Sequence, residues 1–363
     1  MKYAFIVLIA TVVFAVIIGI FGIILGGQSL AGGANAGILV TRDNGATWDF
    51  LKDSFKFEVS VLKMDNNGTR LLVGTKHNGL WINKPDAGAW ERLGSEKLSI
   101  AQVLDAAWLP ANTVGRPANA ADKSANAVGG STNSLLAAVF NDQRGRVERL
   151  SGSSEAELYF TPLANYAVFG VAAHPIHSNI LWIVSSDGGF YESSDGGSSW
   201  RTVYRFKEGL LRLVSNPVMP GNLWVVTSKG NLYITYDSGR SWRDLSGGLN
   251  KLYNASKIES LIFDNQSGVL YLGSNYGLSR SYDRGESWQN VPIALPPEAL
   301  PVTAIATDSR NSNKIAVSVQ NEIFMSEDGG VDWMGIILPT KRAVSAIVID
   351  PVNSNNIYVG LKK

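Results

Sequence analysis

The carboxylates with the most regular spacing in this sequence are aspartates in a recurring octet, Ser/Thr-x-Asp-x-Gly-x-x-Trp. The five intact copies contain Asp43, Gly45 and Trp48; Asp195, Gly197 and Trp200; Asp237, Gly239 and Trp242; Asp283, Gly285 and Trp288; and Asp328, Gly330 and Trp333. A shortened copy, with one spacer fewer, contains Asp86, Gly88 and Trp90. Calcium binding would need further oxygen ligands and a closing glutamate, which the octets lack. We therefore assign the aspartates to tight turns, where the carboxylate accepts backbone N–H bonds and the glycine takes positive φ.

The composition excludes several kinds of chemistry. The chain has no Cys, so disulfides, thiolate catalysis and Cys-ligated metals are ruled out, and its three histidines leave little room for a histidine metal site. We expect no metal and no cofactor. With 32 Lys plus Arg against 31 Asp plus Glu, the net charge of +1 gives no bulk attraction to nucleic acid, and no nucleic-acid partner is expected.

Common catalytic motifs are also missing from the sequence. It contains no G-x-S-x-G elbow, no Walker A sequence and no H-E-x-x-H pair. We therefore name no catalytic residue.

The elements that carry the octets are predicted to be short strands. Between octets, alternating apolar and polar residues are separated by turns rich in Pro, Asn and Gly, which is typical of antiparallel sheet. Each repeat is therefore predicted to be a four-stranded meander, A-B-C-D, with the octet at the C–D turn. The octet aspartates are 43, 109, 42, 46 and 45 residues apart. The long step covers two repeats and places a degenerate octet near residues 141–146.

The spacing predicts an all-β fold, a seven-bladed β-propeller over residues 37–363. The residues after Asp328 and the residues before Asp43 each supply part of one further repeat. We expect residues 344–361 to pair with residues 37–51, so that both ends of this region build one blade. Residues 109–133, rich in Ala, Asn, Ser and Gly, are predicted to be an exposed low-complexity insertion whose role stays open.

The N-terminal region has a different composition. Residues 1–27 are apolar apart from Lys2, which predicts a transmembrane signal anchor, and residues 28–36 resemble a flexible tether. The positive-inside rule keeps Lys2 in the cytoplasm and places the propeller outside it, on a single-pass cell-membrane protein. The alternative is a secreted protein cleaved near Ala36.

The octets resemble the Asp-box, or BNR, repeats of a superfamily that includes sialidases, two-propeller xyloglucanases, sortilin-type receptors and photosystem II assembly factors. A second recurring stretch, Asp/His/Asn-Pro-x-x-Ser-Asn, supports the resemblance at Asp350–Tyr358 and His174–Trp182. The resemblance implies the fold and says little about function, because enzymes and binding proteins share the box. The arginine motif of sialidases is absent from the first blade, and xyloglucanases bind substrate between two propellers, whereas this chain has the length for one.

In this superfamily the D–A and B–C loops form the usual binding face. The resemblance therefore suggests ligand-binding candidates in these loops, chosen because Arg and Tyr are enriched at binding hot spots and the segments carry more bases than acids. The candidates are Arg205, Arg212, Tyr253, Tyr276, Lys76 and His77. The leading interpretation is a membrane-anchored, extracytoplasmic, non-enzymatic scaffold that binds an envelope protein or a glycan. Alternatives are a sialidase- or xyloglucanase-like glycoside hydrolase and a sortilin-like peptide receptor.

Overall fold

The computed structural model describes residues 37–54, 56–85, 87–94, 98–110, 134–151, 157–162, 165–252, 257–293 and 300–362. The predicted membrane anchor, the tether and most of the predicted insertion lie outside these residues. Among the residues described, none of the helices is long and apolar enough to cross a membrane.

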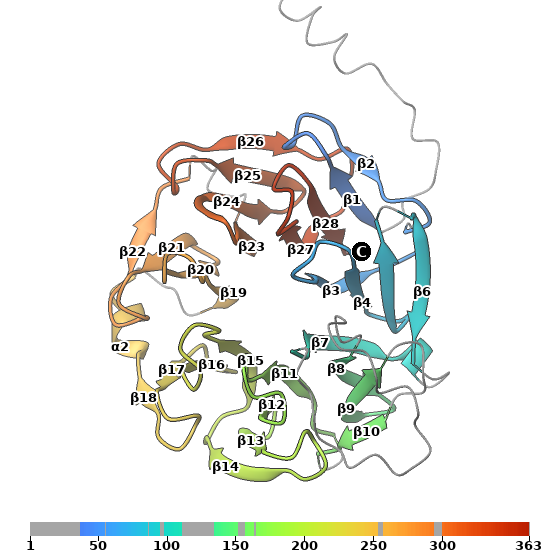
Figure 1. Ribbon diagram of the computed structural model, residues 1–363. Coiled ribbons are helices and arrows are strands. Elements are labelled where there is room, and N and C mark those ends of the chain that lie inside the picture. Colours follow the sequence, from blue (N-terminus) through green and yellow to red (C-terminus); the bar gives the residue numbers. More distant parts are fainter. Residues whose placement is uncertain are drawn as a thin grey trace, which may run out of the picture. The chain divides into compact units, whose positions relative to one another are not determined.

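The described residues form seven four-stranded antiparallel sheets, arranged in a ring (Figure 1). Six sheets follow the chain from the innermost to the outermost strand. They are β3 (Val59–Met64), β4 (Leu71–Thr75), β5 (Leu80–Lys84) and β6 (Ala89–Leu93); β7 (Gln102–Trp108), β8 (Ser134–Asn141), β9 (Arg144–Ser151) and β10 (Glu157–Phe160); β11 (Val168–Ala173), β12 (Leu181–Ser185), β13 (Gly189–Ser193) and β14 (Arg201–Arg205); β15 (Leu210–Ser215), β16 (Leu223–Thr227), β17 (Leu232–Thr235) and β18 (Arg243–Asp244); β19 (Ile258–Phe263), β20 (Leu270–Ser274), β21 (Gly277–Ser281) and β22 (Gln289–Val291); and β23 (Val302–Asp308), β24 (Asn311–Val319), β25 (Glu322–Ser326) and β26 (Met334–Ile337). Two short helices, η1 (Leu98–Ile100) and α2 (Ser246–Leu249), lie in connections.

The seventh sheet uses both ends of the described region. Its order is β27 (Val344–Ile349), β28 (Ile357–Leu361), β1 (Ile38–Thr41) and β2 (Asp49–Phe50). Strand β1 pairs with β28 from Ile38 opposite Gly360 to Thr41 opposite Ile357. We call this the closing sheet. Its innermost strand, β27, contacts the innermost strands β3 and β23 on either side, so the ring is complete. The seven-bladed propeller predicted from the octet spacing is confirmed.

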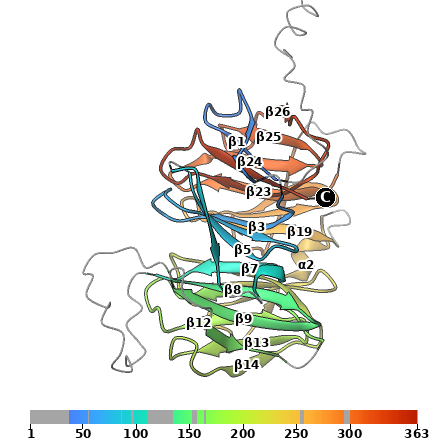
Figure 2. The same ribbon diagram turned by 90° about the vertical axis from the view of Figure 1, so that its right-hand side faces the viewer.

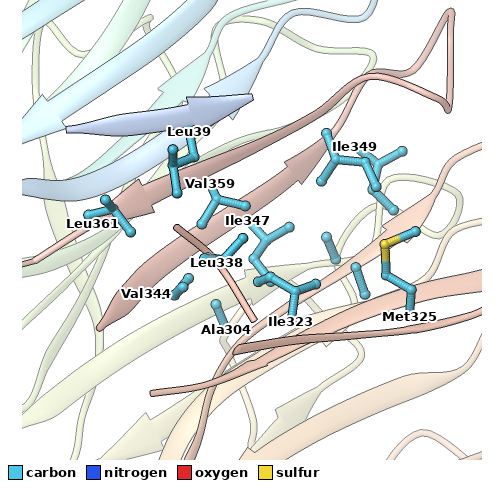
Figure 3. Close-up of a cluster of buried hydrophobic side chains, with 13 residues drawn as sticks. Leu39, Ala304, Ile323, Met325, Leu338, Val344, Ile347, Ile349, Val359 and Leu361 are labelled. Carbon is cyan, nitrogen blue, oxygen red and sulfur yellow. The ribbon is translucent and has the colours of Figure 1, made fainter. Parts of the chain in front are cut away.

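The apolar residues of the sequence are buried between neighbouring sheets. The second strands of five sheets, β4, β12, β16, β20 and β28, are buried along their whole length, because sheets cover them on both faces. Outermost strands such as β14 are mostly exposed. Figure 3 shows one cluster between sheets, in which Leu39 and Val359 of the closing sheet share a core with Ile323 of β25. The side view in Figure 2 shows strands β24–β26 and strands β12–β14 on opposite sides of the ring.

The prediction of a degenerate octet near residues 141–146 is wrong. These residues form the hairpin between β8 and β9, which is a B–C turn, with Asp142 and Gln143 at φ 50° and 60°. Two successive residues at positive φ form the tight hairpin loop that suits the twist of paired strands. Asp and Asn favour both this hairpin loop and the octet turn, so composition alone does not distinguish the two kinds of turn. The C–D connection of this sheet falls at residues 152–156, outside the described residues.

Candidate functional site

Each intact octet forms a self-contained turn at the C–D end of its sheet. In the first, the Asp43 carboxylate accepts hydrogen bonds from the Thr47 N–H (2.9 Å), the Thr47 hydroxyl (2.6 Å) and the Thr41 hydroxyl (2.7 Å). The Trp48 indole N–H donates to the Gly45 carbonyl at 3.2 Å, and Gly45 has φ 88°. The turns of Asp195, Asp237, Asp283 and Asp328 repeat the bond from the hydroxyl two residues before the aspartate and the bond from the indole.

Hydrogen bonding keeps the octet carboxylates ionised. Bonds from Thr47 and Thr41 lower the pKa of Asp43 to about 2. Burial would raise the pKa of Asp237, but bonds from Ser241 and Thr235 outweigh it and lower the pKa to about 2. Such groups are fully ionised at neutral pH and committed to their own turns, so they are unsuited to general acid catalysis. The shortened octet differs: Asp86 lies outside the described residues, and Trp90 donates to the Lys52 carbonyl at 2.7 Å.

The second motif caps the A–B turns at the same end of the sheets. The Asp350 carboxylate accepts the N–H groups of Val352 (2.8 Å) and Asn353 (3.1 Å). Asn216 plays the same part in its sheet, and in another sheet His174 Nδ1 accepts the N–H groups two and three residues ahead at 3.2 and 3.0 Å. Asp, Asn and His interchange here because each offers an acceptor at this place. Burial, with a smaller effect of His177, lowers the pKa of His174 and favours the neutral ring that can accept. We call the end with the octet and A–B turns the box face.

The B–C hairpins and D–A segments form the opposite end, which we call the hairpin face. Of the predicted ligand-binding residues, Lys76 and His77 are exposed in the hairpin between β4 and β5, and Tyr276 is 46% exposed between β20 and β21. Arg205 ends strand β14. These candidates belong to three different sheets and do not form one cluster. Tyr253 lies outside the described residues.

Arg212 has a different environment from the other candidates. It lies on the innermost strand β15, half buried, and its guanidinium donates to the Glu259 carbonyl of the neighbouring sheet. Burial lowers its pKa. In the structure Arg212 links two sheets.

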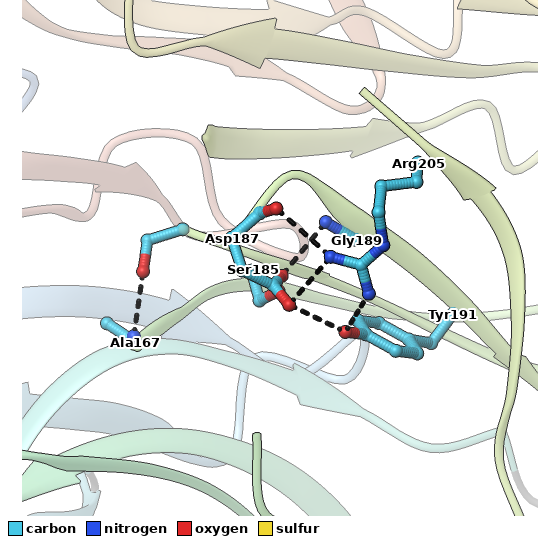
Figure 4. Close-up of polar contacts among 7 residues, drawn as sticks. Ala167, Ser185, Asp187, Gly189, Tyr191 and Arg205 are labelled. Atoms are coloured by element: carbon cyan, nitrogen blue, oxygen red, sulfur yellow. Dashed lines mark hydrogen bonds and ion pairs between the residues drawn. The ribbon is translucent and has the colours of Figure 1, made fainter. Parts of the chain in front are cut away.

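Arg205 belongs to a hydrogen-bonded cluster (Figure 4). Its guanidinium contacts the Asp187 carboxylate at 2.9 Å and the Tyr191 hydroxyl at 3.1 Å, and that hydroxyl donates to Asp187 at 3.1 Å. Burial would raise the pKa of Asp187, but bonds from Ser185 and Arg205 outweigh it and keep the pKa below its usual range. The cluster orients Arg205 at the surface.

Four ion pairs give the hairpin face its electrostatic character. The pairs are Lys76–Glu58 (3.2 Å), Arg205–Asp187 (2.9 Å), Lys229–Glu208 (3.2 Å) and Lys257–Glu259 (2.9 Å). The cationic side chains are 48–73% exposed, whereas the acidic side chains are 10–24% exposed. The cations therefore face solvent and the carboxylates lie beneath them. Sequence reasoning missed the pairing with Glu58, Glu208 and Lys229. The pairs join different connections and their sequence spacings are not all the same, so no single spacing signals them.

A bulge near the start of every innermost strand exposes one residue at the hairpin end of the ring. Each register shift leaves one residue unpaired and at least partly exposed; in strand order these are Ser60, Leu104, Phe169, Leu211, Glu259, Thr303 and Ser345. Bulges re-aim side chains and are frequent beside functional sites. Three consecutive sheets contribute Leu104, Phe169 and Leu211, which we call the apolar arc. The hydroxyl-bearing bulge residues come from three other consecutive sheets.

Burial raises the pKa of Glu148, the one carboxyl group among the described residues whose pKa is raised. It lies within strand β9 and is 6% exposed, so it does not open on the hairpin face. No group of three or more potential metal ligands occurs among the described residues.

The fold and the box turns define an Asp-box propeller with seven blades. No protein-family model and no curated protein matches the sequence. Among solved structures, the fold is similar to the GH74 xyloglucanase from Xanthomonas campestris (TM-score 0.65, 16% identity) and the GH74 enzyme from Niastella koreensis (0.65, 17%), with 84% of this chain and 51% of either enzyme covered. It is also similar to YCF48 bound to a D1 peptide (TM-score 0.61, 13% identity), with 85% of this chain and 93% of that chain covered.

These likenesses show the fold and confirm the resemblance to xyloglucanases and to photosystem II assembly factors. The chain spans about half the length of each GH74 enzyme and nearly the whole of YCF48.

Proposed function

We propose that this propeller is a non-enzymatic scaffold that binds a protein partner on its hairpin face. The observation that carries the proposal is the arrangement of the four ion pairs, in which the cations are more exposed to solvent than the carboxylates they pair with. The face therefore presents positive groups to an approaching partner, although the chain as a whole is nearly neutral. The apolar arc, on the innermost strands at the same end of the ring, adds area that can be removed from water. Together they suit an acidic polypeptide segment with an apolar side chain.

The similarity in size to YCF48, which was solved with a bound peptide, also supports a binding role. A glycoside hydrolase is the alternative. Most glycoside hydrolases use two carboxyl groups facing the substrate, one of them with a raised pKa. On the hairpin face, Asp187 and Glu208 are paired with cations, and a hydrogen bond from Thr227 lowers the pKa of Glu208. A sortilin-like receptor has less support, because such receptors have ten blades.

The proposal includes attachment to the membrane through residues 1–27, with the propeller outside the cytoplasm. Its support is the apolar composition of that segment. Alkaline extraction of membranes from expressing cells tests it: the full chain should stay in the pellet. Release of a shortened chain beginning near Ala36 would favour the secreted alternative.

The binding face is tested by reversing two of its exposed cations, Arg205→Glu together with Lys229→Glu, in the full chain. Site-specific photocross-linking from His77 in cells should give a defined adduct that the double variant loses. Lys84→Glu, at an exposed lysine at the other end of strand β5, is the matched control and should keep the adduct. An unchanged adduct in the double variant would remove the hairpin face from consideration. Arg212 is not suitable for this test, because it is half buried and its replacement would break a link between two sheets.

Catalysis is tested separately. The purified chain is incubated with a panel of polysaccharides, and new reducing ends are measured. A scaffold releases none, whereas release by the wild type would establish the hydrolase.

A further inference from the structure

The box face carries an exposed cluster that the fold does not require. Val218 and Met219, in the turn between β15 and β16, are 66% and 44% exposed, and Tyr236, in the octet turn of the same sheet, is 47% exposed. Large apolar side chains this exposed are noteworthy where they meet. The turns that carry them are joined, since the Ser238 N–H donates to the Gly221 carbonyl at 3.1 Å.

Arg284, from the octet of the next sheet, joins this cluster. Its Nη2 lies 3.4 Å from the Met219 sulfur, and its guanidinium lies 6.0 Å from the centre of the Tyr236 ring. Arg240, four residues after Tyr236, is exposed, and its Nη1 donates to the Asp237 carbonyl at 2.7 Å. We call Val218, Met219, Tyr236, Arg240 and Arg284 the Tyr236 cluster.

The backbone of Arg284 has positive φ, as does the fourth residue of every intact octet. The φ values are 57° at Asn44, 74° at Gly196, 58° at Ser238, 64° at Arg284 and 79° at Gly329. The conformation belongs to the turn, and the left-handed region favours Gly and Asn over residues such as Arg. The Arg284 carbonyl accepts the Trp224 indole N–H at 2.9 Å, which a glycine could do equally well. The turn therefore has no structural need for the arginine side chain.

The five intact octets provide an internal comparison. Their second position holds Arg42, Ser194, Tyr236, Tyr282 and Glu327, and their fourth holds Asn44, Gly196, Ser238, Arg284 and Gly329. The turn hydrogen bonds come from other positions, so these two are free to vary. Tyrosine occurs in two adjacent sheets, and Arg280 stacks on Tyr282 at 5.3 Å as Arg284 does on Tyr236. The octet of β25 and β26 instead adds acids, Glu327 and Asp332.

The guanidinium groups of the cluster keep most of their donors free. A guanidinium has five N–H donors, and within the described part of the chain Arg240 and Arg284 form no ion pair and one hydrogen-bond contact each. The carboxylates of the two octets that supply the cluster are already bound, Asp237 by Thr235 and Ser241 and Asp283 by Ser281 and Ser287. A partner's carboxylate can therefore bind here without displacing an internal one, and Met219 and Tyr236 supply an apolar surface beside it.

We propose that the Tyr236 cluster is a second docking surface, on the opposite end of the propeller from the hairpin face, for a polypeptide segment that pairs a carboxylate with an aromatic or aliphatic side chain. Two faces with separate partners would allow the propeller to bridge them. This surface is independent of the hairpin face, and either can fail without the other.

The test uses the full chain and a fluorescent synthetic peptide, Glu-Phe-Glu-Leu-Glu with capped ends, in anisotropy titrations. Arg284→Gly should raise the dissociation constant about tenfold or more, because a charge-assisted bidentate contact is lost. Its thermal unfolding should stay near that of the wild type, since glycine already occupies this position in two other octets. Tyr236→Ser should weaken binding further, whereas Ser194→Thr, at the same octet position of another sheet, should have no effect.

Two altered peptides test which chemical groups of the partner are recognised. A peptide with Lys in place of Glu, and one with Ser in place of Phe and Leu, should both bind at least tenfold more weakly. The proposal is overturned if the wild type shows no saturable binding up to about 1 mM, if Arg284→Gly binds equally well, or if a neutral oligosaccharide binds in place of the peptide. The double variant at Arg205 and Lys229 should bind this peptide normally.

Discussion

The carboxylates at the two ends of the propeller differ in whether they pair with a cation. On the box face, each octet aspartate is held by hydroxyl and N–H groups of its own turn, within a few residues of sequence. On the hairpin face, Asp187 and Glu208 also accept hydroxyl hydrogen bonds, but each pairs in addition with a cation that faces solvent. The octet is therefore a closed structural unit that five sheets repeat, whereas the ion pairs leave charge available to a partner. If this contrast is right, substitutions at the two ends should differ in what they cost the fold.

The largest difference in unfolding free energy is expected between substitutions of two glycines, one at each end of the propeller. Gly239, in an octet, has φ 89°, and a Cβ there would lie 2.2 Å from the Phe190 ring of the neighbouring sheet. Gly277, in a B–C hairpin, has φ 121° and no atom within 4 Å of such a Cβ. Gly239→Ala should cost about 3 kcal/mol of unfolding free energy through overpacking and strain, and Gly277→Ala about 1 kcal/mol through strain alone. Denaturant unfolding measures both, and equal losses would contradict the difference in packing.

The next effect concerns the hydroxyl that begins the octet. Thr235 donates to Asp237 at 2.7 Å and accepts the Gly239 N–H at 2.9 Å, and it is buried. Thr235→Val keeps the shape but leaves a buried N–H without its partner, which should cost about 2 kcal/mol. Thr202→Val, on the exposed face of strand β14, is the matched control and should change stability by less than about 0.5 kcal/mol. A small loss at both positions would mean that the octet is held mainly by its tryptophan.

The octets made the fold predictable, because a turn with its own hydrogen bonds looks the same in sequence wherever it occurs. Counting them gave seven sheets even though two sheets lack an intact copy. The error at Asp142 and Gln143 arose where the octet was missing, since strands β8 and β9 are each eight residues long and meet in a different kind of turn.

The site was less predictable, for reasons that depend on packing between segments. Arg205 could be placed on the hairpin face from its position between strands D and A, but its partner Tyr191 is brought to it by sheet pairing. Arg212 was expected at the surface. The bulge at Leu211 shifts the register by one residue and directs Arg212 toward the neighbouring sheet. The bulge residue Leu211 is itself apolar and follows Leu210, so the apolar pattern does not show where the register shifts.

The octet carboxylates should make the stability of the protein depend on pH in acid. The pKa of Asp43 and of Asp237 falls from 3.8 to about 2 on folding. The unfolded chain therefore binds protons more readily, so the stabilisation is complete above about pH 4 and is lost as the pH falls toward 2. The melting temperature measured from pH 6 to pH 2 should drop steeply below pH 4. Asp237→Asn should start from a lower melting temperature and show a shallower drop, and parallel curves would mean that this carboxylate does not titrate with folding.

The smallest effect on the unfolding free energy is expected at an exposed ion pair of the hairpin face. Lys229 pairs with Glu208 at 3.2 Å but is 73% exposed, and Glu208 also accepts hydrogen bonds from Thr227 at 2.7 Å and Asn231 at 3.1 Å. Lys229→Met should therefore change the unfolding free energy by less than about 0.5 kcal/mol, as is usual for exposed ion pairs. Raising the salt concentration should leave the wild type equally stable. A loss above about 1.5 kcal/mol would mean that the outward cations hold the hairpins together. A negligible loss would mean that folding does not need the charge of Lys229, which leaves it available to a partner.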